Sequence, residues 1–430
     1  MEALVLFGLL FLLIAIGVPI AISLGLSSML MIFLYGTSTL NLQARSVVTA
    51  LDSYPLLAVP LFILAGDLMF SGGLSRRLIA FVDSIVGHFK AGLGYVNVLA
   101  STFFAAISGS SPATVAAIGT NMIPEMEKRE YTKEYSTSLT AASGMIGVLI
   151  PPSIPFIMYG ISAEQSVGVL FIAGIIPGLL FSLGFMITAY ILYRKLGFQQ
   201  LGQGQFVLLN VWKTFVKAIW AILAPVIILG GIYGGLFSPT EAAAVGVFYS
   251  LIVGVFIYRD LKIKDIPKVF MQSSLTSGTV LALVAFASIF GRLLTLEQVP
   301  VKLANFLTGI SDSPIVILLI INLMLLVVGM FMETIASIII LTPILLPVVT
   351  AVGVDPILFG VIMTVNLAIG FCTPPLGVNL FVASGISGLS IEKISKAILP
   401  YFIVMIILLL LVTYVPAISL YLPNQIIGTN

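Results

Sequence analysis

Charged residues are scarce in this sequence of 430 residues, of which 8% are charged and 60% are hydrophobic. A typical soluble domain has about a quarter of its residues charged. With a mean hydropathy of +1.20, the chain has too few polar side chains to cover a water-facing surface. Its apolar residues also form runs long enough to cross a bilayer. The composition therefore excludes a soluble globular protein and predicts an all-α polytopic membrane protein.

Cysteine and histidine are almost absent, with one residue of each, Cys372 and His88. A single cysteine excludes a disulfide within the chain, and a single histidine argues against a histidine-based transition-metal centre or catalytic dyad. The sequence also has no G-x-x-x-x-G-K-[ST] loop, which would indicate ATP binding. We therefore expect no enzyme activity and no bound cofactor.

Basic charge is low overall and local where it occurs. A net charge of +2 indicates no nucleic-acid partner. Both ends of the chain lack Lys and Arg, so we place both termini outside, and the N-terminus lacks the basic region of a cleaved signal peptide. The positive-inside rule places three basic groups on the cytoplasmic side: Lys128, Arg129 and Lys133; Arg194, Lys195, Lys213 and Lys217; and Arg259, Lys262, Lys264 and Lys268.

Long uncharged stretches lie between these groups. Several exceed the roughly 20 residues that one crossing needs and are interrupted by Gly or Pro, so we expect some of them to hold two segments. We expect about ten to twelve spanning helices together with shorter re-entrant pieces.

An internal duplication is the strongest sign of how the chain is organised. The charge groups predict that residues 1–200 run from outside to inside and residues 210–430 from inside to outside. Inverted repeats with Gly- or Pro-broken helices at matching positions indicate a transporter with its site near the midplane; the alternative is coincidence among common residues. Matching residues recur 223 positions apart: Pro124 and Pro347, Gly147 and Gly370, Pro151-Pro152 and Pro374-Pro375, and Pro177 and Pro400.

One stretch in each half has the pattern of a re-entrant helical hairpin. In the first half, Ala106-Ile-Ser-Gly-Ser-Ser-Pro-Ala-Thr lies in an uncharged run long enough for a helix, a tight turn and a second helix. Pro112 suits the first turn of that second helix, and Ser110 or Ser111 would cap it. The counterpart in the second half is Gly329-Met-Phe-Met-Glu-Thr-Ile-Ala-Ser.

Each half also has a segment that should break a helix: Gly147-Val-Leu-Ile-Pro-Pro-Ser-Ile-Pro and Gly370-Phe-Cys-Thr-Pro-Pro-Leu-Gly-Val-Asn. Two adjacent prolines remove two backbone donors, and unwound backbone at bilayer depth is tolerated only when it is buried or lines a cavity. Its carbonyls suit Na⁺, and half-helix N-termini favour an anionic group. The two hairpin–break pairs therefore predict two cation sites flanking one substrate site. The alternative for either motif alone is that Gly and Pro merely kink packed helices.

Four polar residues are candidates for contact with a substrate. Glu333 lies between two apolar runs, where an ionisable residue indicates ion coupling or substrate contact; a packing carboxylate is the alternative. Asn379 lies within the second broken segment. Asn366 and Ser143 occupy equivalent positions before the two breaks, where interhelical hydrogen bonding is the competing role. Asp67 is interpreted as a structural residue near a helix end.

Four motifs make the sequence resemble the large membrane subunit of tripartite ATP-independent periplasmic (TRAP) transporters. The resemblance runs over essentially the whole chain, and among such subunits the sequence is most similar to bacterial sialic-acid members. The motifs are Pro60-Leu-Phe-Ile-Leu-Ala-Gly, Ser108-Gly-Ser-Ser-Pro-Ala-Thr, Ile150-Pro-Pro-Ser-Ile-Pro and Thr373-Pro-Pro-Leu-Gly-Val-Asn-Leu.

The resemblance implies partners and a location. Such subunits pair with a small (Q-type) membrane subunit in the bacterial inner membrane and receive an organic acid, here sialic acid, from a periplasmic binding protein. A Na⁺ gradient drives the import. This chain would be the large subunit alone, surrounded by membrane lipids, with no small-subunit segment fused at its N-terminus.

The resemblance also implies an elevator, in which a mobile transport domain slides against a scaffold. The implied scaffold comprises residues 1–45 and 210–260, and the arm helices lie near 75–88 and 300–310. The hairpins and broken helices of the transport domain would lie within 91–180 and 314–400.

Sodium ions bind, in this family, where hairpin tips meet broken helices, with several ligands acting through their backbone carbonyls. Carried over to this sequence, the ligands form one set in each half: Ser108, Ser111, Gly147, Ile150 and Ser153 in the first, and Gly329, Gly370, Thr373 and Leu376 in the second.

Three other functions compete with this interpretation. A self-sufficient Na⁺- or H⁺-coupled anion carrier of the same architecture would need no binding protein. An intramembrane enzyme would need a pair of aspartates or a metal site at depth, which the sparse carboxylates and the single histidine argue against. A channel would lack saturable, Na⁺-dependent uptake.

Overall fold

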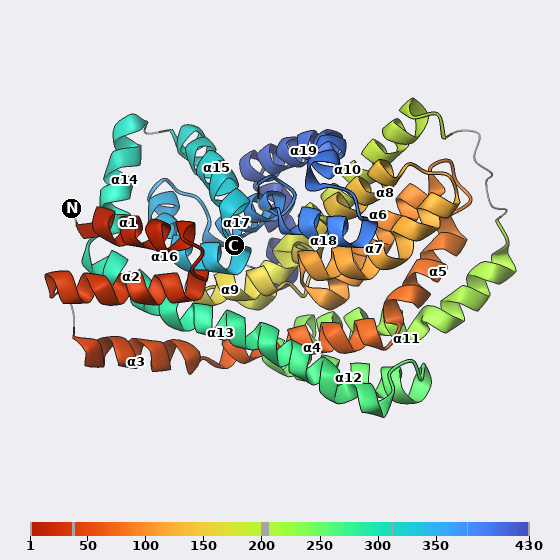
Figure 1. The fold of residues 1–430 in the computed structure, drawn as a ribbon, viewed down its shortest axis with the longest axis horizontal. Coiled ribbons are helices and arrows are strands. Elements are labelled where there is room, and N and C mark those ends of the chain that lie inside the picture. Colours follow the sequence, from red (N-terminus) through yellow and green to blue (C-terminus); the bar gives the residue numbers. More distant parts are fainter. Residues whose placement is uncertain (1, 37–38, 199–205, 312, 376, 429–430) are drawn as a thin grey trace.

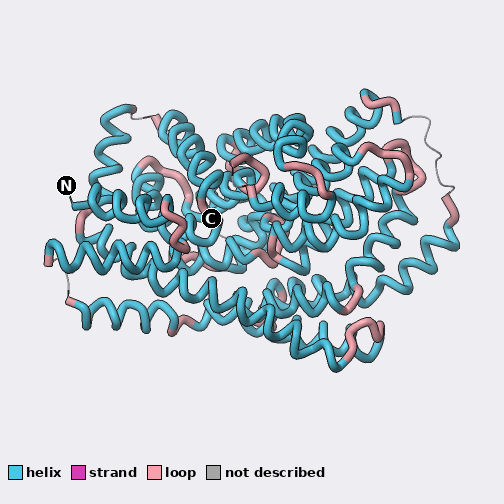
Figure 2. Tube along the Cα trace, viewed as in Figure 1, coloured by secondary structure: helices cyan, strands magenta, loops and turns pink. Residues whose placement is uncertain are grey.

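The fold is helical throughout the part of the chain that the computed structural model describes, which is residues 2–36, 39–198, 206–311, 313–375 and 377–428 (Figure 2). Within these residues, eight helical segments are long and apolar enough to cross a membrane, and five shorter helices are also apolar. The prediction of an all-α polytopic protein is confirmed. The eight segments are fewer than the expected ten to twelve spans, because the five other apolar helices are shorter than a full crossing.

The described residues of the first half form ten α-helices. They are α1 (Glu2–Ala15), α2 (Ile20–Tyr35), α3 (Leu40–Leu51), α4 (Ala58–Ser71), α5 (Leu74–Val86), α6 (Gly92–Ser108), α7 (Ser111–Lys128), α8 (Lys133–Gly144), α9 (Ile154–Ser162) and α10 (Val167–Lys195), with short 3₁₀ turns before α4 and after α8.

In the second half, ten more α-helices are formed by the residues that the structure describes. They are α11 (Leu208–Tyr233), α12 (Pro239–Ile252), α13 (Ile266–Leu296), α14 (Val299–Ile310), α15 (Pro314–Phe331), α16 (Thr334–Ala351), α17 (Pro356–Gly370), α18 (Val378–Ser387), α19 (Ile391–Tyr414) and α20 (Ala417–Ile427).

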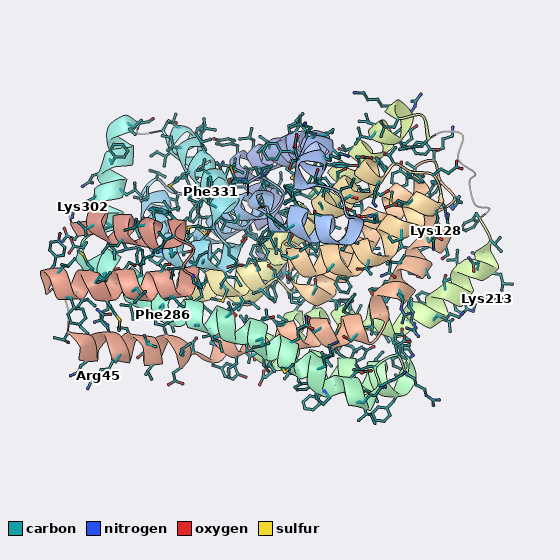
Figure 3. The ribbon with its side chains drawn as sticks, in the orientation of Figure 1. Arg45, Lys128, Lys213, Phe286, Lys302 and Phe331 are labelled. Carbon is teal, nitrogen blue, oxygen red and sulfur yellow. The ribbon has the colours of Figure 1, made fainter. Side chains whose placement is uncertain are left out.

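Helix α13 crosses much of the molecule along its long axis (Figure 1). It contacts α2, α3 and α4 from the first half and α16 from the second. Helix α12 packs on α4, and the hairpin and broken-helix elements lie on the other side of this layer in the view of Figure 1. Lys128 and Lys213, from two of the predicted cytoplasmic groups, lie toward the same end of the molecule, whereas Arg45 and Lys302 lie toward the other (Figure 3).

The two halves place the same elements in the same order, and the 223-residue offset extends to their helix caps. Ser110 caps α7 by accepting a hydrogen bond from the backbone of the third residue along, and Glu333 caps α16 in the same way. Thr132 and Asp355, the residues before α8 and α17, are also 223 positions apart. The offset found among Gly and Pro residues is therefore an offset of whole structural elements.

The first hairpin turns over a very short distance. Helix α6 ends at Gly109, whose φ of 59° lies in the left-handed region that favours glycine. Ser110 is extended and caps α7, and Pro112 lies in the first turn of that helix. In the second hairpin, the turn between α15 and α16 consists of Met332 and Glu333.

Both predicted breaks are present. After α8 the chain makes one 3₁₀ turn and then leaves the helical path until α9 begins at Ile154. After α17 it leaves the helical path until α18 begins at Val378. Each double proline has a cis peptide bond between its two prolines. The first break is completely buried, as expected for unwound backbone within an apolar protein.

Tyr159 and Gly360 join the two halves at a tightly packed contact. Tyr159 on α9 is fully buried, and its hydroxyl donates to the carbonyl of Pro356 at 2.6 Å. A methyl group at Gly360 would overlap the ring of Tyr159. Alanine normally stabilises a helix relative to glycine by about 1 kcal/mol, but overpacking a core costs about 1–3 kcal/mol.

We therefore expect Gly360→Ala to lower the melting temperature of the detergent-purified protein by about 2 °C or more. Gly278→Ala is the matched control, because Gly278 lies within α13 and a methyl group there has no neighbour within 4 Å. Equal melting temperatures for the two variants would contradict the tight contact between α9 and α17.

Candidate functional site

The tip of the first hairpin is built from small polar residues. Ser108 and Ser111 are buried, at 5% and 0% exposure. The hydroxyl of Ser108 lies 3.0 Å from that of Thr114, and Ser110 accepts a hydrogen bond as the cap of α7. The tip thus concentrates hydroxyl and backbone groups at the start of a helix.

This tip packs directly on the first broken helix. The backbone N–H of Ile154 donates to the carbonyl of Gly109 at 3.2 Å. A methyl group at Gly147 would lie only 2.6 Å from the carbonyl oxygen of Ser110, so only glycine permits this approach. The hydroxyl of Ser153 donates to the carbonyl of Val148 at 2.6 Å, across the break.

The predicted ligands of the first half are therefore partly brought together. Ser108, Ser111 and Gly147 meet at the hairpin tip, and Ser153 begins the helix after the break. The side chain of Ile150 instead packs against α10. A ligand role for Ile150 would have to use its backbone carbonyl.

The second half repeats the packing of hairpin on broken helix. Gly329 on α15 and Gly370 at the end of α17 are in backbone contact, and a side chain on Gly370 would overlap the carbonyl of Gly329. Thr373 lies in the break, where its hydroxyl donates to the carbonyl of Ile369 at 2.8 Å. Leu376 lies outside the described residues.

Asn379 links the second half to the first. Its side chain is fully buried, accepts a hydrogen bond from the hydroxyl of Ser111 at 3.0 Å and donates to that hydroxyl at 2.8 Å. Its amide also donates to the carbonyl of Ala141 on α8 at 3.0 Å. The sequence placed Asn379 in its own broken segment, but only the fold reveals that its partners belong to the other half.

Ser143 and Asn366 are both fully buried on the helices before the two breaks. Asn366 donates to the side-chain oxygen of Asn322 at 2.8 Å, and Asn322 in turn donates to Thr413. The Ser143 hydroxyl and the Asn366 side-chain oxygen have no hydrogen-bond partner among the described residues. Neither residue lines the cavity that lies between the two hairpin tips.

A cavity of about 790 Å³ lies between the two hairpin tips and the layer that contains α4 and α13. Glu333 lines it from the second hairpin, with its carboxylate accepting from the backbone N–H of Ala336 at 3.1 Å. Ser108, Ser110 and Ser111 line it from the first. A volume of this size is within the range that binds a small organic molecule.

The cavity wall also contains polar residues that the sequence interpretation missed. Asp67 on α4 and Gln272, Thr276 and Thr279 on α13 face the same space. The spacing of the three α13 residues, at i, i+4 and i+7, was a readable signal of one polar helix face. The side chain of Asp67 was interpreted as structural, because nothing in the sequence indicated which elements would surround it.

The polar groups at the two hairpin–break contacts are of the kind that coordinates a hard cation. The described residues contain no group of three or more His, Cys, Asp or Glu side chains that could hold a metal ion. Hydroxyl and backbone carbonyl oxygens are present at both hairpin–break contacts. Oxygen ligands of this kind suit alkali and alkaline-earth cations rather than transition metals.

Comparison with known proteins identifies related chains. Residues 7–418 match the family described as the tripartite ATP-independent periplasmic transporter, DctM component. The isethionate TRAP transporter permease protein DctMQ of Oleidesulfovibrio alaskensis is 48% identical over 97% of this chain, which spans 66% of that relative. The C4-dicarboxylate TRAP transporter large permease protein DctM of Pseudomonas aeruginosa is 45% identical, with 94% of each chain covered.

Relatives named for sialic acid are somewhat less similar. The large permease protein SiaM of Vibrio cholerae is 38% identical over 98% of each chain. In contrast to the expectation from the sequence, the isethionate and C4-dicarboxylate permeases therefore have the higher identities. The crystal structure of the Alcanivorax borkumensis YdaH transporter has a TM-score of 0.64 at 15% identity, covering 90% of this chain and 88% of that one, which is a likeness of fold.

The match to the family covers nearly the whole chain, and several relatives above 30% identity are covered almost end to end. These relatives are named as transporter permeases, not as enzymes. This chain accordingly belongs to the DctM family and is a large, multi-pass permease subunit of a tripartite ATP-independent periplasmic transporter.

Proposed function

We propose that this permease imports an organic acid together with Na⁺ by an elevator movement. The observation that carries the proposal is that each hairpin tip packs on the broken helix of its own half, with one cavity between the two tips. Paired half-helix ends beside a midplane cavity are the arrangement in which secondary transporters bind ions and substrate.

The proposed cation sites lie at the two hairpin–break contacts. In the first half, the hydroxyls of Ser108, Ser111 and Ser153 and the carbonyls of Gly147 and Ile150 are the proposed ligands. In the second, they are the carbonyls of Gly329, Gly370 and Leu376 with the hydroxyl of Thr373. The buried, unpartnered oxygens of Ser143 and Asn366 support ion binding nearby, because buried polar groups normally have a partner.

The proposed transport domain consists of the hairpins, the broken helices and the long helices that follow them. It is supported by the hydrogen bonds of Asn379 and Tyr159, which join the two halves into one body. Helices α5 and α14 largely coincide with the ranges proposed for the arms, and α1, α2, the start of α3, α11 and α12 lie in those proposed for the scaffold. We further propose that the basic loops are cytoplasmic, that both termini are periplasmic and that the membrane is the bacterial inner membrane.

The proposed partners are a small membrane subunit and a periplasmic binding protein. The relative named DctMQ is longer than this chain, which supports a second permease component. Helix α11 offers an exposed apolar face that suits such a subunit or lipid; it includes Leu208, Leu209, Trp212 and Val216.

Uptake by the reconstituted complex tests this function. Proteoliposomes with the small subunit and binding protein should accumulate one of isethionate, succinate or sialic acid when a Na⁺ gradient is imposed. Omission of the binding protein should abolish uptake. Uptake by the permease chain alone would instead support a self-sufficient carrier, and accumulation without Na⁺ would contradict sodium coupling.

Replacing Pro151-Pro152 with Ala-Ala should raise the Na⁺ concentration for half-maximal uptake by about tenfold or more, because restored helix would remove free carbonyls from the first cation site. Pro225→Ala, within α11, is the matched control and should leave the Na⁺ dependence unchanged. An unchanged Na⁺ dependence in the double variant would count against a cation site at this break.

Gly370→Val should abolish uptake while the protein still inserts into the membrane and assembles with the small subunit, because its side chain would push the second hairpin away from the broken helix. Gly385→Val on α18, where a methyl group has no neighbour within 4 Å, should retain uptake. Wild-type uptake by the Gly370 variant would refute the close approach.

A further inference from the structure

Asp67 is a charged residue within a helical segment long and apolar enough to span the membrane, Tyr54–Ser71. Its half-buried carboxylate lines the central cavity and accepts a hydrogen bond from the hydroxyl of Ser273 on α13 at 2.6 Å. Among the described residues it has no ion-pair partner. A charge at this depth is costly, and one that is kept without a countercharge points to function.

The charge of Asp67 is also not offset by its helix. Asp67 lies in the C-terminal half of α4, toward the helix end whose partial charge is negative. Glu333 differs, because its carboxylate caps the N-terminus of α16, where the partial charge is positive. Of the two carboxylates that line the cavity, Asp67 is therefore the one whose negative charge is not offset by a helix end.

The remaining cavity lining adds no positive charge. No Lys or Arg is among the described residues that line it, and the residues that α13 contributes to the lining are all uncharged. Gly66, beside Asp67, lies against the first hairpin tip, because a methyl group on Gly66 would be 3.4 Å from the Cα of Ser108. The negative charge of Asp67 on α4 thus adjoins the proposed first cation site at the first hairpin tip.

We propose that Asp67 is a charge filter that enforces the coupling of substrate to cation. Its fixed negative charge lies on α4, which packs on the proposed scaffold helix α12, and it repels a transport domain that carries a substrate anion alone. When cations are bound at the hairpin tips, they offset the negative charge of the substrate anion, and the transport domain can move past Asp67. The inference rests on the proposed Na⁺-coupled uptake and explains how such a protein prevents an uncoupled leak of its substrate.

A competing role is structural, in which Asp67 only fastens α4 to α13 through Ser273. Two substitutions distinguish the structural role from the charge filter. Asp67→Asn removes the charge but keeps an oxygen that can accept from Ser273. Ser273→Ala removes the hydrogen bond but keeps the charge.

The test is leak of substrate in Na⁺-free medium. Complexes with the small subunit and binding protein are reconstituted, loaded with whichever of radiolabelled isethionate, succinate or sialic acid the wild type accumulates, and diluted into choline buffer. We expect the leak through Asp67→Asn to exceed the wild-type leak by about tenfold, which corresponds to ~1.4 kcal/mol in barrier height. Ser273→Ala and Asp67→Glu should stay near the wild-type leak.

A second variant tests the filter without altering Asp67. Thr276→Lys places a positive charge on the exposed face of α13 that lines the same cavity and should also raise the leak, whereas Thr276→Gln should not. If Asp67→Asn fails to assemble with the small subunit, the comparison of Thr276→Lys with Thr276→Gln tests the charge filter on its own.

Two results would overturn the inference, and they differ. Wild-type leak rates in both Asp67→Asn and Thr276→Lys, with Na⁺-dependent uptake intact, would refute the charge filter alone. Na⁺-independent accumulation by the wild-type complex would refute the proposed coupling on which the filter rests.

Discussion

Unwound backbone within an apolar protein is the constraint on which the rest of this structure depends. Between α8 and α9, and again between α17 and α18, the chain gives up helical hydrogen bonds at a depth where lipid cannot replace them. The structure answers by packing a hairpin on each break, through Gly147 in one half and the contact of Gly329 with Gly370 in the other. Glycine is required at these positions because backbone meets backbone.

This packing places polar groups where a transporter needs them. The same hairpin tips that cover the breaks contribute serine hydroxyls and a helix N-terminus to a shared cavity. The Asn379–Ser111 hydrogen bonds then tie the second half to the first tip. Stability and ligand binding therefore use one set of contacts, so a change that loosens a tip should disturb both.

Charge in the cavity poses a problem for a carrier of organic acids. Its described lining contains two carboxylates and no basic side chain. The carboxylate of Glu333 is favoured by the helix that it caps, whereas that of Asp67 lies near the negative end of its helix. The proposed coupling to a cation would resolve this conflict, because bound cations would offset the negative charge of both the substrate and the cavity wall.

Much of the fold could be predicted because its signals are local. Low charge predicted the membrane helices, Gly109 and Pro112 predicted the first hairpin, and the double prolines predicted both breaks. The common offset of 223 residues predicted the repeat, which the caps Ser110 and Glu333 also follow. Each of these features depends on residues within a few positions of one another or on simple spacing.

The composition of the cavity could not be predicted in the same way. The partner of Asn379 is 268 residues away, and Asp67 lies 206 residues from Ser273. Which side chains face one another across such separations is decided by how helices pack, and uniformly apolar helices give little indication of the face that each will bury. The membrane class, the hairpins, the breaks and the repeat were readable from the sequence, because they follow from local backbone chemistry or from simple spacing. The set of polar groups that shares the cavity emerged only from the folded structure, because helix packing brings together residues that are far apart in the chain.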